Sequence, residues 1–260
     1  MSGRIVTRRE GRIGWLAFDH AERRNAISVD MWRHIPAAVK ELGEDDEVRV
    51  VVLRGEGDVA FVSGADISEF ASARSGDGVA QYDVDSAVAF LALQDLPKPV
   101  IAMIHGFCVG GGVALALTAD LRYAAADAKF AVPAARLGLG YHMSGVEALA
   151  NVVGFSAAKE IFFTARQFSA EEALRMGLAN AVLPKKDLEA FVREAAERIA
   201  GNAPLTLRSV KLVVRELAKA HSARDYDAVN ASIAACFGSA DYAEGVRAFL
   251  EKRRPDFRGR

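Results

Sequence analysis

The sequence has few cysteines, almost no net charge and no apolar core at its start. Its two cysteines, Cys108 and Cys236, lie far apart in 260 residues and outside any metal-binding motif, which excludes a disulfide framework and a zinc site. The 33 Lys and Arg against 34 Asp and Glu give a net charge of −1, which argues against a nucleic-acid-binding surface. The first residues lack a signal peptide's apolar core. We therefore expect a cytoplasmic protein without nucleic-acid or membrane partners.

The bulk composition is that of a folded globular protein. Hydrophobic residues make up 51% of the chain and charged residues 26%, and a chain of this length buries about three quarters of its unfolded surface. Residues 100–119 carry no charge and are long enough to cross a membrane. They contain four closely spaced glycines, which break helices. We interpret the segment as a buried strand, a glycine-rich turn and a buried helix.

Strand and helix patterns alternate up to about residue 183, and only helical patterns follow. We expect strands at 5–7, 13–18, 48–53, 99–105, 121–125, 129–132 and 178–183. We expect helices at 28–42, 79–93, 111–119, 187–200, 204–218, 224–236 and 242–253, and a mobile loop at 72–78. Ser169 and Glu172 form a capping box, and Pro36 should disturb the first helix. The order predicts an α/β core with an all-α C-terminal region.

Three consecutive glycines, Gly110, Gly111 and Gly112, separate the strand at 99–105 from a helix. Such a turn directs unpaired N–H groups and the positive end of a helix at one place, which suits a phosphate or a developing oxyanion. A dinucleotide-binding motif would need glycine at position 115, which is Leu115, and no phosphate-binding Gly-Lys-Ser/Thr follows. Close packing of strand and helix explains the glycines equally well.

A second turn of small residues, 63–67 (Ser-Gly-Ala-Asp-Ile), leaves another predicted strand. Here too a backbone N–H can point outward with no side chain in its way. Taken alone, the motif is better explained as a plain turn in which Asp66 caps the next helix.

Together these turns and several other segments resemble the crotonase (enoyl-CoA hydratase/isomerase) superfamily. The matching segments are 25–27, 61–67, 98–102, 106–112, 119–122, Phe130 with Pro133, 137–139, 173–178 and 249–253. They run in register over nearly the whole chain. The resemblance implies a crotonase-like spiral of β-β-α units in a core of residues 1–195. It implies that residues 196–260 form a C-terminal helical region for trimerisation and for completing the CoA site.

The resemblance also implies a substrate and a binding site. The substrate would be an acyl-CoA thioester, with no separate cofactor and no metal, bound by a homotrimer or homohexamer. The N–H groups of Ala65 and Gly111 would form the oxyanion hole for the thioester carbonyl. The residues that match CoA contacts of the family are Arg23, Arg24, Ile27, Ser63, Asp66, Ile67, Phe249 and Lys252. For the arginines and the lysine, a solvated charged surface is the alternative.

The chain departs from the hydratases of this family at both of their catalytic glutamates. These glutamates lie two residues after the third glycine and, about twenty residues on, directly after a proline. The corresponding residues here are Ala114 and Ala134. General acid–base catalysis contributes about 10²–10⁴-fold per group, so water addition by the usual route should be severely impaired. Isomerases that keep only the second glutamate are excluded on the same ground.

His142 follows in a loop, at a position that resembles that of a working aspartate in dienoyl-CoA isomerases and in 4-chlorobenzoyl-CoA dehalogenase. An imidazole can act as base, acid or nucleophile near neutral pH. We expect His142, aided by Tyr141, to transfer protons. A helix-capping or solvent-facing loop histidine is the alternative. Glu147 is nearby in sequence but is more typical of a helix surface.

We predict an acyl-CoA-processing, enoyl-CoA hydratase-like enzyme. The alternatives are a CoA-thioester hydrolase, dehalogenase or isomerase on the same scaffold, and a non-catalytic acyl-CoA-binding protein. His105 ends a buried strand and should be a hydrogen-bonded core histidine. Cys108 should be a small buried hydrophobe rather than a nucleophile.

Overall fold

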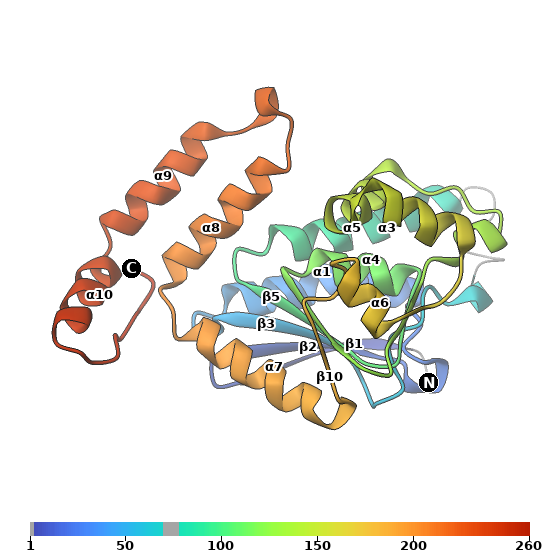
Figure 1. Ribbon diagram of the computed structural model, residues 1–260, viewed down its shortest axis with the longest axis horizontal. Coiled ribbons are helices and arrows are strands. Elements are labelled where there is room, and N and C mark those ends of the chain that lie inside the picture. Colours follow the sequence, from blue (N-terminus) through green and yellow to red (C-terminus); the bar gives the residue numbers. More distant parts are fainter. Residues whose placement is uncertain (1–2, 70–77) are drawn as a thin grey trace.

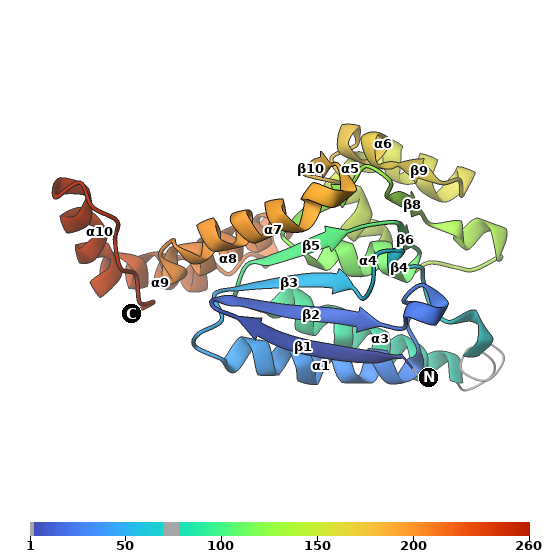
Figure 2. The ribbon, with the colours of Figure 1, turned by 90° about the horizontal axis from the view of Figure 1, so that it is seen from below.

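A computed structural model describes residues 3–69 and 78–260. Among these residues, a six-stranded sheet in the order β1-β2-β3-β5-β7-β10 forms the centre (Figures 1 and 2). Its strands are β1 (Arg4–Glu10), β2 (Ile13–Asp19), β3 (Val50–Gly55), β5 (Val100–Ile104), β7 (Leu121–Ala125) and β10 (Ala181–Leu183). β1 and β2 form the predicted antiparallel hairpin, and the other neighbours are parallel. The loop predicted at 72–78 lies outside the described residues, except for Gly78, which begins a helix.

A smaller sheet, in the order β4-β6-β8-β9, lies beside the first. Its strands are β4 (Ala60–Val62), β6 (Phe107–Val109), β8 (Lys129–Ala131) and β9 (Phe168–Ser169). The chain crosses from the large sheet to the small one from β3 to β4, from β5 to β6 and from β7 to β8, and each crossing leads to a helix. This is the expected β-β-α unit. The prediction of a turn directly after residue 105 was wrong, because 107–109 pair with β4 and β8 as a short strand.

Helices cover both faces of the large sheet (Figure 2). The helices of this core are α1 (Val29–Glu44), α3 (Gly78–Asp95), α4 (Gly111–Thr118), α5 (Met143–Thr164), α6 (Ala170–Arg175) and α7 (Lys185–Ala200). Alternate residues of each strand enter two hydrophobic clusters, as the period of a strand requires. Leu53 packs with α1 and α3 on one face, and Val52 packs with α7 on the other. Because both faces are covered, the central strands are apolar throughout.

Local sequence signals place several element ends. The Ser28 hydroxyl accepts a hydrogen bond from Met31 N at 3.3 Å and starts α1, which continues through Pro36. The predicted capping box is confirmed, since Ser169 Oγ accepts from Glu172 N at 3.2 Å while Glu172 Oε2 accepts from Ser169 N at 2.8 Å. The strand predicted at 178–183 was too long. The N–H groups of residues 178 and 179 both donate to Ala173 O at the end of α6, so pairing starts only at residue 181.

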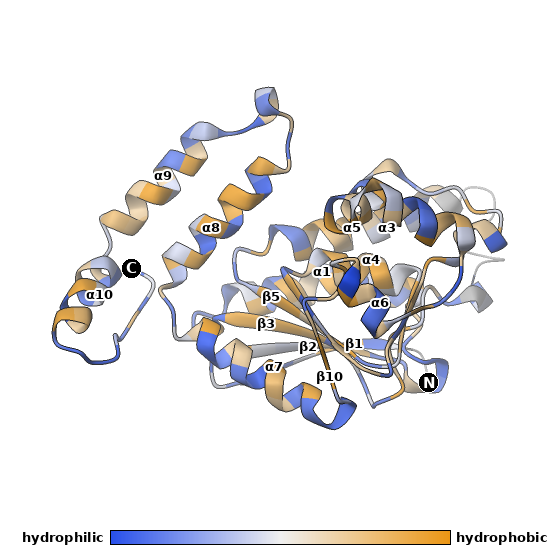
Figure 3. Ribbon diagram, viewed as in Figure 1, coloured by the Kyte–Doolittle hydropathy of each residue, from blue (hydrophilic) through white to orange (hydrophobic). Residues whose placement is uncertain are grey.

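The C-terminal helices extend away from this core (Figure 1). They are α8 (Pro204–Leu217), α9 (Tyr226–Phe237) and α10 (Ala240–Leu250). Hydrophobic residues recur along these helices (Figure 3). The exposed ones are Val210, Val214, Leu217, Tyr226, Ile233, Phe237, Tyr242, Val246, Phe249 and Leu250. Within the described ranges no helix has the length and apolarity that a bilayer span requires; the uncharged residues 100–119 form β5, β6 and α4.

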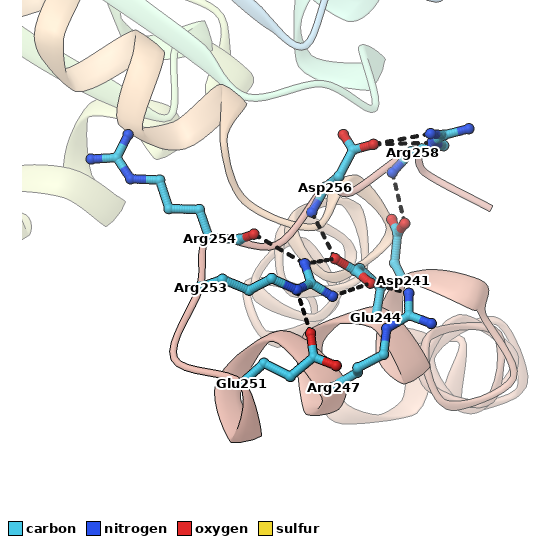
Figure 4. Close-up of polar contacts among 8 residues, drawn as sticks. All are labelled: Asp241, Glu244, Arg247, Glu251, Arg253, Arg254, Asp256 and Arg258. Carbon is cyan, nitrogen blue, oxygen red and sulfur yellow. Dashed lines mark hydrogen bonds and ion pairs between the residues drawn. The ribbon is translucent and has the colours of Figure 1, made fainter.

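Glu244 ties the end of the chain to α10 (Figure 4). Its carboxylate accepts hydrogen bonds from Arg247, from Arg253 Nη2 at 3.0 Å and from Asp256 N at 3.1 Å. The Arg253 guanidinium, followed by Arg247 and the Asp256 N–H, holds the pKa of Glu244 well below its usual value of 4.5. A carboxylate with a lowered pKa stabilises the folded state above its unfolded pKa and loses this contribution as the pH falls.

We therefore expect Glu244→Gln to lower the melting temperature at neutral pH. The deficit relative to the unmodified protein should shrink as the pH falls from 4.5 toward the lower folded-state pKa, because the unfolded chain takes up a proton on Glu244 in this range before the folded protein does. Thermal unfolding followed by circular dichroism over a pH series measures this difference. Glu251→Gln, which removes an exposed partner of Arg253, is the control and should have a smaller effect. A Glu244→Gln deficit that does not change with pH would contradict the prediction.

Candidate functional site

Two backbone N–H groups meet where β4 and β6 end. The two strands pair in parallel, so the residues that follow them emerge at the same edge of the small sheet. Ala65 comes three residues after β4, and Gly111 is the first residue of α4. A Cβ atom built on Gly111 would lie 3.8 Å from Ala65 N. The structure therefore brings together the two residues predicted to form the oxyanion hole.

Both N–H groups are available to a ligand. Ala65 forms a parallel bridge with Ile27, in which Ile27 N donates to Gly64 O at 2.8 Å and Asp66 N donates to Ile27 O at 2.9 Å. In this pattern the N–H of Ala65 points away from Ile27. The N–H of Gly111 belongs to the first turn of α4, which has no acceptor within the helix. Neither group donates to a backbone carbonyl of the described residues. An oxygen that develops negative charge can accept from both.

Glycine is required around this pair for two different reasons. Gly110 has φ +53°, a left-handed conformation that side chains disfavour. A Cβ on Gly112 would lie 2.2 Å from Val62 O, so this glycine lets α4 approach β4. The turn therefore does both things that the sequence allowed: it packs a helix closely on a strand and it exposes N–H groups.

An aromatic pair lies behind the turn. Trp32 Cζ2 of α1 is 3.6 Å from the position of a Cβ on Gly111, and Trp32 Nε1 donates to Tyr82 Oη of α3 at 2.9 Å. Both side chains are buried. Sequence reasoning missed these residues, because an aromatic residue on the apolar face of a helix carries no sign that a site lies beside it.

The two positions of the family glutamates are apolar. Ala114 lies on α4, where its N–H donates to Gly110 O at 3.2 Å. Ala134 lies in a short 3₁₀ helix, η3 (Pro133–Arg136), and is buried. Methyl groups cannot transfer protons, so neither position supplies an acid or a base.

His142 directly precedes α5 and is largely exposed, with 75% of its side chain accessible. Its Nε2 hydrogen-bonds to Asp83 Oδ2 of α3 at 3.1 Å. Tyr141 packs edge-on against Phe162, with ring centroids 4.8 Å apart, and Glu147 is exposed on α5. Sequence reasoning missed Asp83, because one carboxylate on a helix with several acidic residues is not distinctive.

Asp66, the residue after Ala65, forms an ion pair with Arg23. Arg23 Nη1 contacts Asp66 Oδ1 at 2.9 Å and Ser68 Oγ at 2.5 Å. Burial alone would raise the pKa of Asp66, but hydrogen bonds from Ser68 and the charge of Arg23 outweigh it and lower the pKa. Ile67 follows in the short helix η2 (Ile67–Glu69). The cationic group of Arg23 is therefore held by the turn that carries the Ala65 N–H.

The neighbouring predicted CoA contacts are also held in place. The Arg24 guanidinium lies over the Phe107 ring, 4.9 Å from its centroid, and Arg24 O accepts from Ser63 N at 3.1 Å. Phe249, in contrast, lies in the last turn of α10, and Lys252 follows the end of this helix. In the figures α10 is at the opposite end of the molecule from α5 (Figures 1 and 2). Within one chain these two do not join the site.

Other candidate groups do not form a second site. His105 is buried as predicted, and burial, followed by Arg54 and Lys185, lowers its pKa; its Nε2, however, has no hydrogen-bond partner among the described residues. Cys108 is fully buried, and burial raises the pKa of its thiol, as expected for an inert core residue. In the part of the chain that the structure describes, no three side chains of metal-binding type lie together.

Comparisons with known proteins agree with this arrangement. A sequence model described as enoyl-CoA hydratase/isomerase matches residues 8–260. A crotonyl-CoA hydratase of Syntrophomonas wolfei is 33% identical over 97% of both chains. A methylmalonyl-CoA decarboxylase of Escherichia coli is 32% identical over 95% of both chains. The crystal structure of an enoyl-CoA hydratase/carnithine racemase from Magnetospirillum magneticum superposes with a TM-score of 0.94 at 35% identity, covering 98% of this chain and 96% of the other.

The packing at the turn predicts that two neighbouring substitutions destabilise the protein to different extents. Gly112→Ala should lower the free energy of unfolding by about 3 kcal/mol, because its methyl group would lie 2.2 Å from Val62 O. Gly111→Ala should cost less than about 1 kcal/mol, because its methyl group makes only ordinary contacts of 3.6 Å or more. Urea unfolding of the two variants measures both values, and equal destabilisation would contradict this description of the turn.

Proposed function

The chain belongs to the enoyl-CoA hydratase/isomerase family, and we propose that it binds an acyl-CoA thioester and stabilises the enolate formed from it. The observation that carries this proposal is the pair of N–H groups at Ala65 and Gly111, which lie close together and do not donate to a backbone carbonyl of the described residues. The carbonyl oxygen of a thioester gains negative charge when the thioester is converted into its enolate. Each fixed donor aimed at that oxygen is worth about 3–4 kcal/mol in the transition state.

The reaction that we propose is hydratase-like: water adds across the α,β double bond of an enoyl group. His142, assisted by Tyr141, takes the place of the missing glutamates in proton transfer. The alanines at positions 114 and 134 support this role of His142, because they leave the reaction without an acid or a base at the usual positions. The imidazole of His142 is exposed, and an imidazole is the side chain most often used for general acid–base catalysis.

The residues around the Ala65 turn would hold the CoA moiety. Arg23 and Arg24 supply positive charge for its phosphates, and Ile27, Ser63, Asp66 and Ile67 belong to the same turn or adjoin it. Phe249 and Lys252 would contribute from a neighbouring subunit. Lys252 carries positive charge and Phe249 is exposed, as such a contact requires.

A homotrimer or homohexamer is part of the same proposal. Its support is the row of exposed apolar side chains on α8, α9 and α10, because large apolar surfaces of this kind usually pack against another protein. Residues 196–260 would then be the assembly region. A cytoplasmic location is also proposed, in keeping with two free cysteines.

Decarboxylation of a carboxylated acyl-CoA is a second candidate. Loss of CO₂ breaks a carbon–carbon bond and leaves its electron pair in the enolate, so no base has to remove a proton. Ala114 and Ala134 favour it specifically, because an apolar wall does not repel a substrate carboxylate. The 32% identical decarboxylase relative is in keeping with this chemistry.

The decisive experiment combines two substrates with two histidine variants. If the hydratase proposal is correct, the protein hydrates crotonyl-CoA, and His142→Ala lowers kcat by about 10²–10⁴-fold with little change in KM. His34→Ala, which removes another exposed histidine from α1, is the control and should leave kcat unchanged. Mass spectrometry identifies the product.

Two other outcomes have definite meanings. Hydration that persists in His142→Ala would remove His142 from the mechanism. Release of CO₂ from methylmalonyl-CoA, equal in both histidine variants and without crotonyl-CoA hydration, would establish the decarboxylase instead.

A further inference from the structure

A carboxylate on α3 contacts His142 across a separation of 59 residues. The Nε2 of His142 lies 3.1 Å from Asp83 Oδ2, and the two side chains are 75% and 36% exposed. Hydrogen bonds between exposed ionisable groups contribute little to stability. Stability of the fold therefore does not explain this contact. Because one of its two partners is His142, which we propose transfers protons, a role in that proton transfer does explain it.

Asp83 belongs to α3, and this helix is connected by buried contacts to the residues beside the N–H pair of Ala65 and Gly111. Tyr82, the residue before Asp83, is buried and accepts from Trp32 Nε1 at 2.9 Å. Trp32 in turn lies 3.6 Å from the Cβ position of Gly111. The segment of α3 that carries Asp83 is thus anchored by buried contacts to the residues behind the N–H pair. A side chain on such an anchored element can fix the orientation of a partner in a loop.

We propose that Asp83 is a positioning residue for His142 in the proton transfer described above, an inference that rests on the proposed role of His142. In the neutral imidazole, the Nε2–H donates to the Asp83 carboxylate and leaves the lone pair on Nδ1. No described residue hydrogen-bonds to Nδ1, so this atom is free to take a proton from the substrate or from water. Asp83 thereby selects both the tautomer and the ring orientation.

Asp83 also offsets the unfavourable effect of the α5 helix dipole on a positively charged His142. His142 occupies the N-cap of α5, where the helix dipole disfavours a positive charge. Once Nδ1 has taken a proton, the ring is positively charged, and the Asp83 carboxylate stabilises it. The same carboxylate therefore serves His142 before the proton transfer and after it.

A double-mutant cycle on crotonyl-CoA hydration tests this role. Asp83→Asn should lower kcat about tenfold with KM within about twofold, and Asp83→Glu should restore part of the loss because it keeps the carboxylate. In a His142→Ala background, Asp83→Asn should change kcat by less than about twofold, because its effect passes through the imidazole. A purely structural role would give the same loss in both backgrounds.

Asp85→Asn is the matched control. Asp85 lies on the same helix but accepts from Arg33 Nε at 2.7 Å and Gln81 Nε2 at 2.8 Å, so its substitution should leave kcat unchanged. If His142→Ala loses activity while Asp83→Asn does not, the positioning role is overturned and the proposed function stands. If the unmodified protein does not hydrate crotonyl-CoA, the proposed function fails. If His142→Ala keeps full activity, the proposed role of His142 fails while hydration stands. In both cases the positioning role fails as well.

Discussion

The parallel pairing of β4 with β6 is the constraint on which the site depends. It brings the ends of two strands to one edge, so that Ala65 and Gly111 present their N–H groups together. The donors belong to the backbone, and their positions are therefore set by strand pairing and by the close approach of α4, not by side-chain rotamers. Such donors need no reorganisation when charge develops on a bound oxygen.

The proposed mechanism assigns two tasks to different parts of the structure. In the proposed mechanism, stabilisation of the oxyanion depends on the backbone N–H groups of Ala65 and Gly111. Proton transfer resides in side chains, and alanine at positions 114 and 134 removes it from the usual places. The proposed mechanism moves that task to His142, on a different loop and next to a carboxylate of α3. A scaffold of this type can thus change its reaction without changing how it holds the carbonyl.

Much of the fold could be predicted because its signals are local. Helix caps such as Ser28 and Ser169, the apolar runs of the central strands, and the start of α4 at Gly111 were all predicted correctly. The resemblance to the crotonase superfamily predicted that the turns at residues 63–67 and 110–112 belong to one site. The hydrophobic pattern alone did not indicate this. The predictions that were wrong concern elements whose formation depends on residues far away in the sequence. β6 is only three residues long and exists because β4 and β8 flank it.

The same limit applies to the site. Ala65 and Gly111 were found through the resemblance, whereas the Trp32–Tyr82 pair and Asp83 depend on contacts between α1, α3 and the residues before α5. No spacing within one segment reveals such contacts. The lack of a hydrogen-bond partner for His105 Nε2 among the described residues is likewise a property of tertiary packing.

The proposed mechanism requires that two backbone N–H groups polarise a thioester carbonyl. Isotope-edited infrared spectroscopy tests it most directly, with butyryl-CoA carrying ¹³C at the thioester carbonyl, because this saturated ligand cannot be hydrated. Two hydrogen bonds to the carbonyl oxygen weaken the C=O bond, so we predict that its stretching band lies at lower wavenumber in the complex than in water. Binding with an unshifted band would show that the carbonyl lies elsewhere and would contradict the claim.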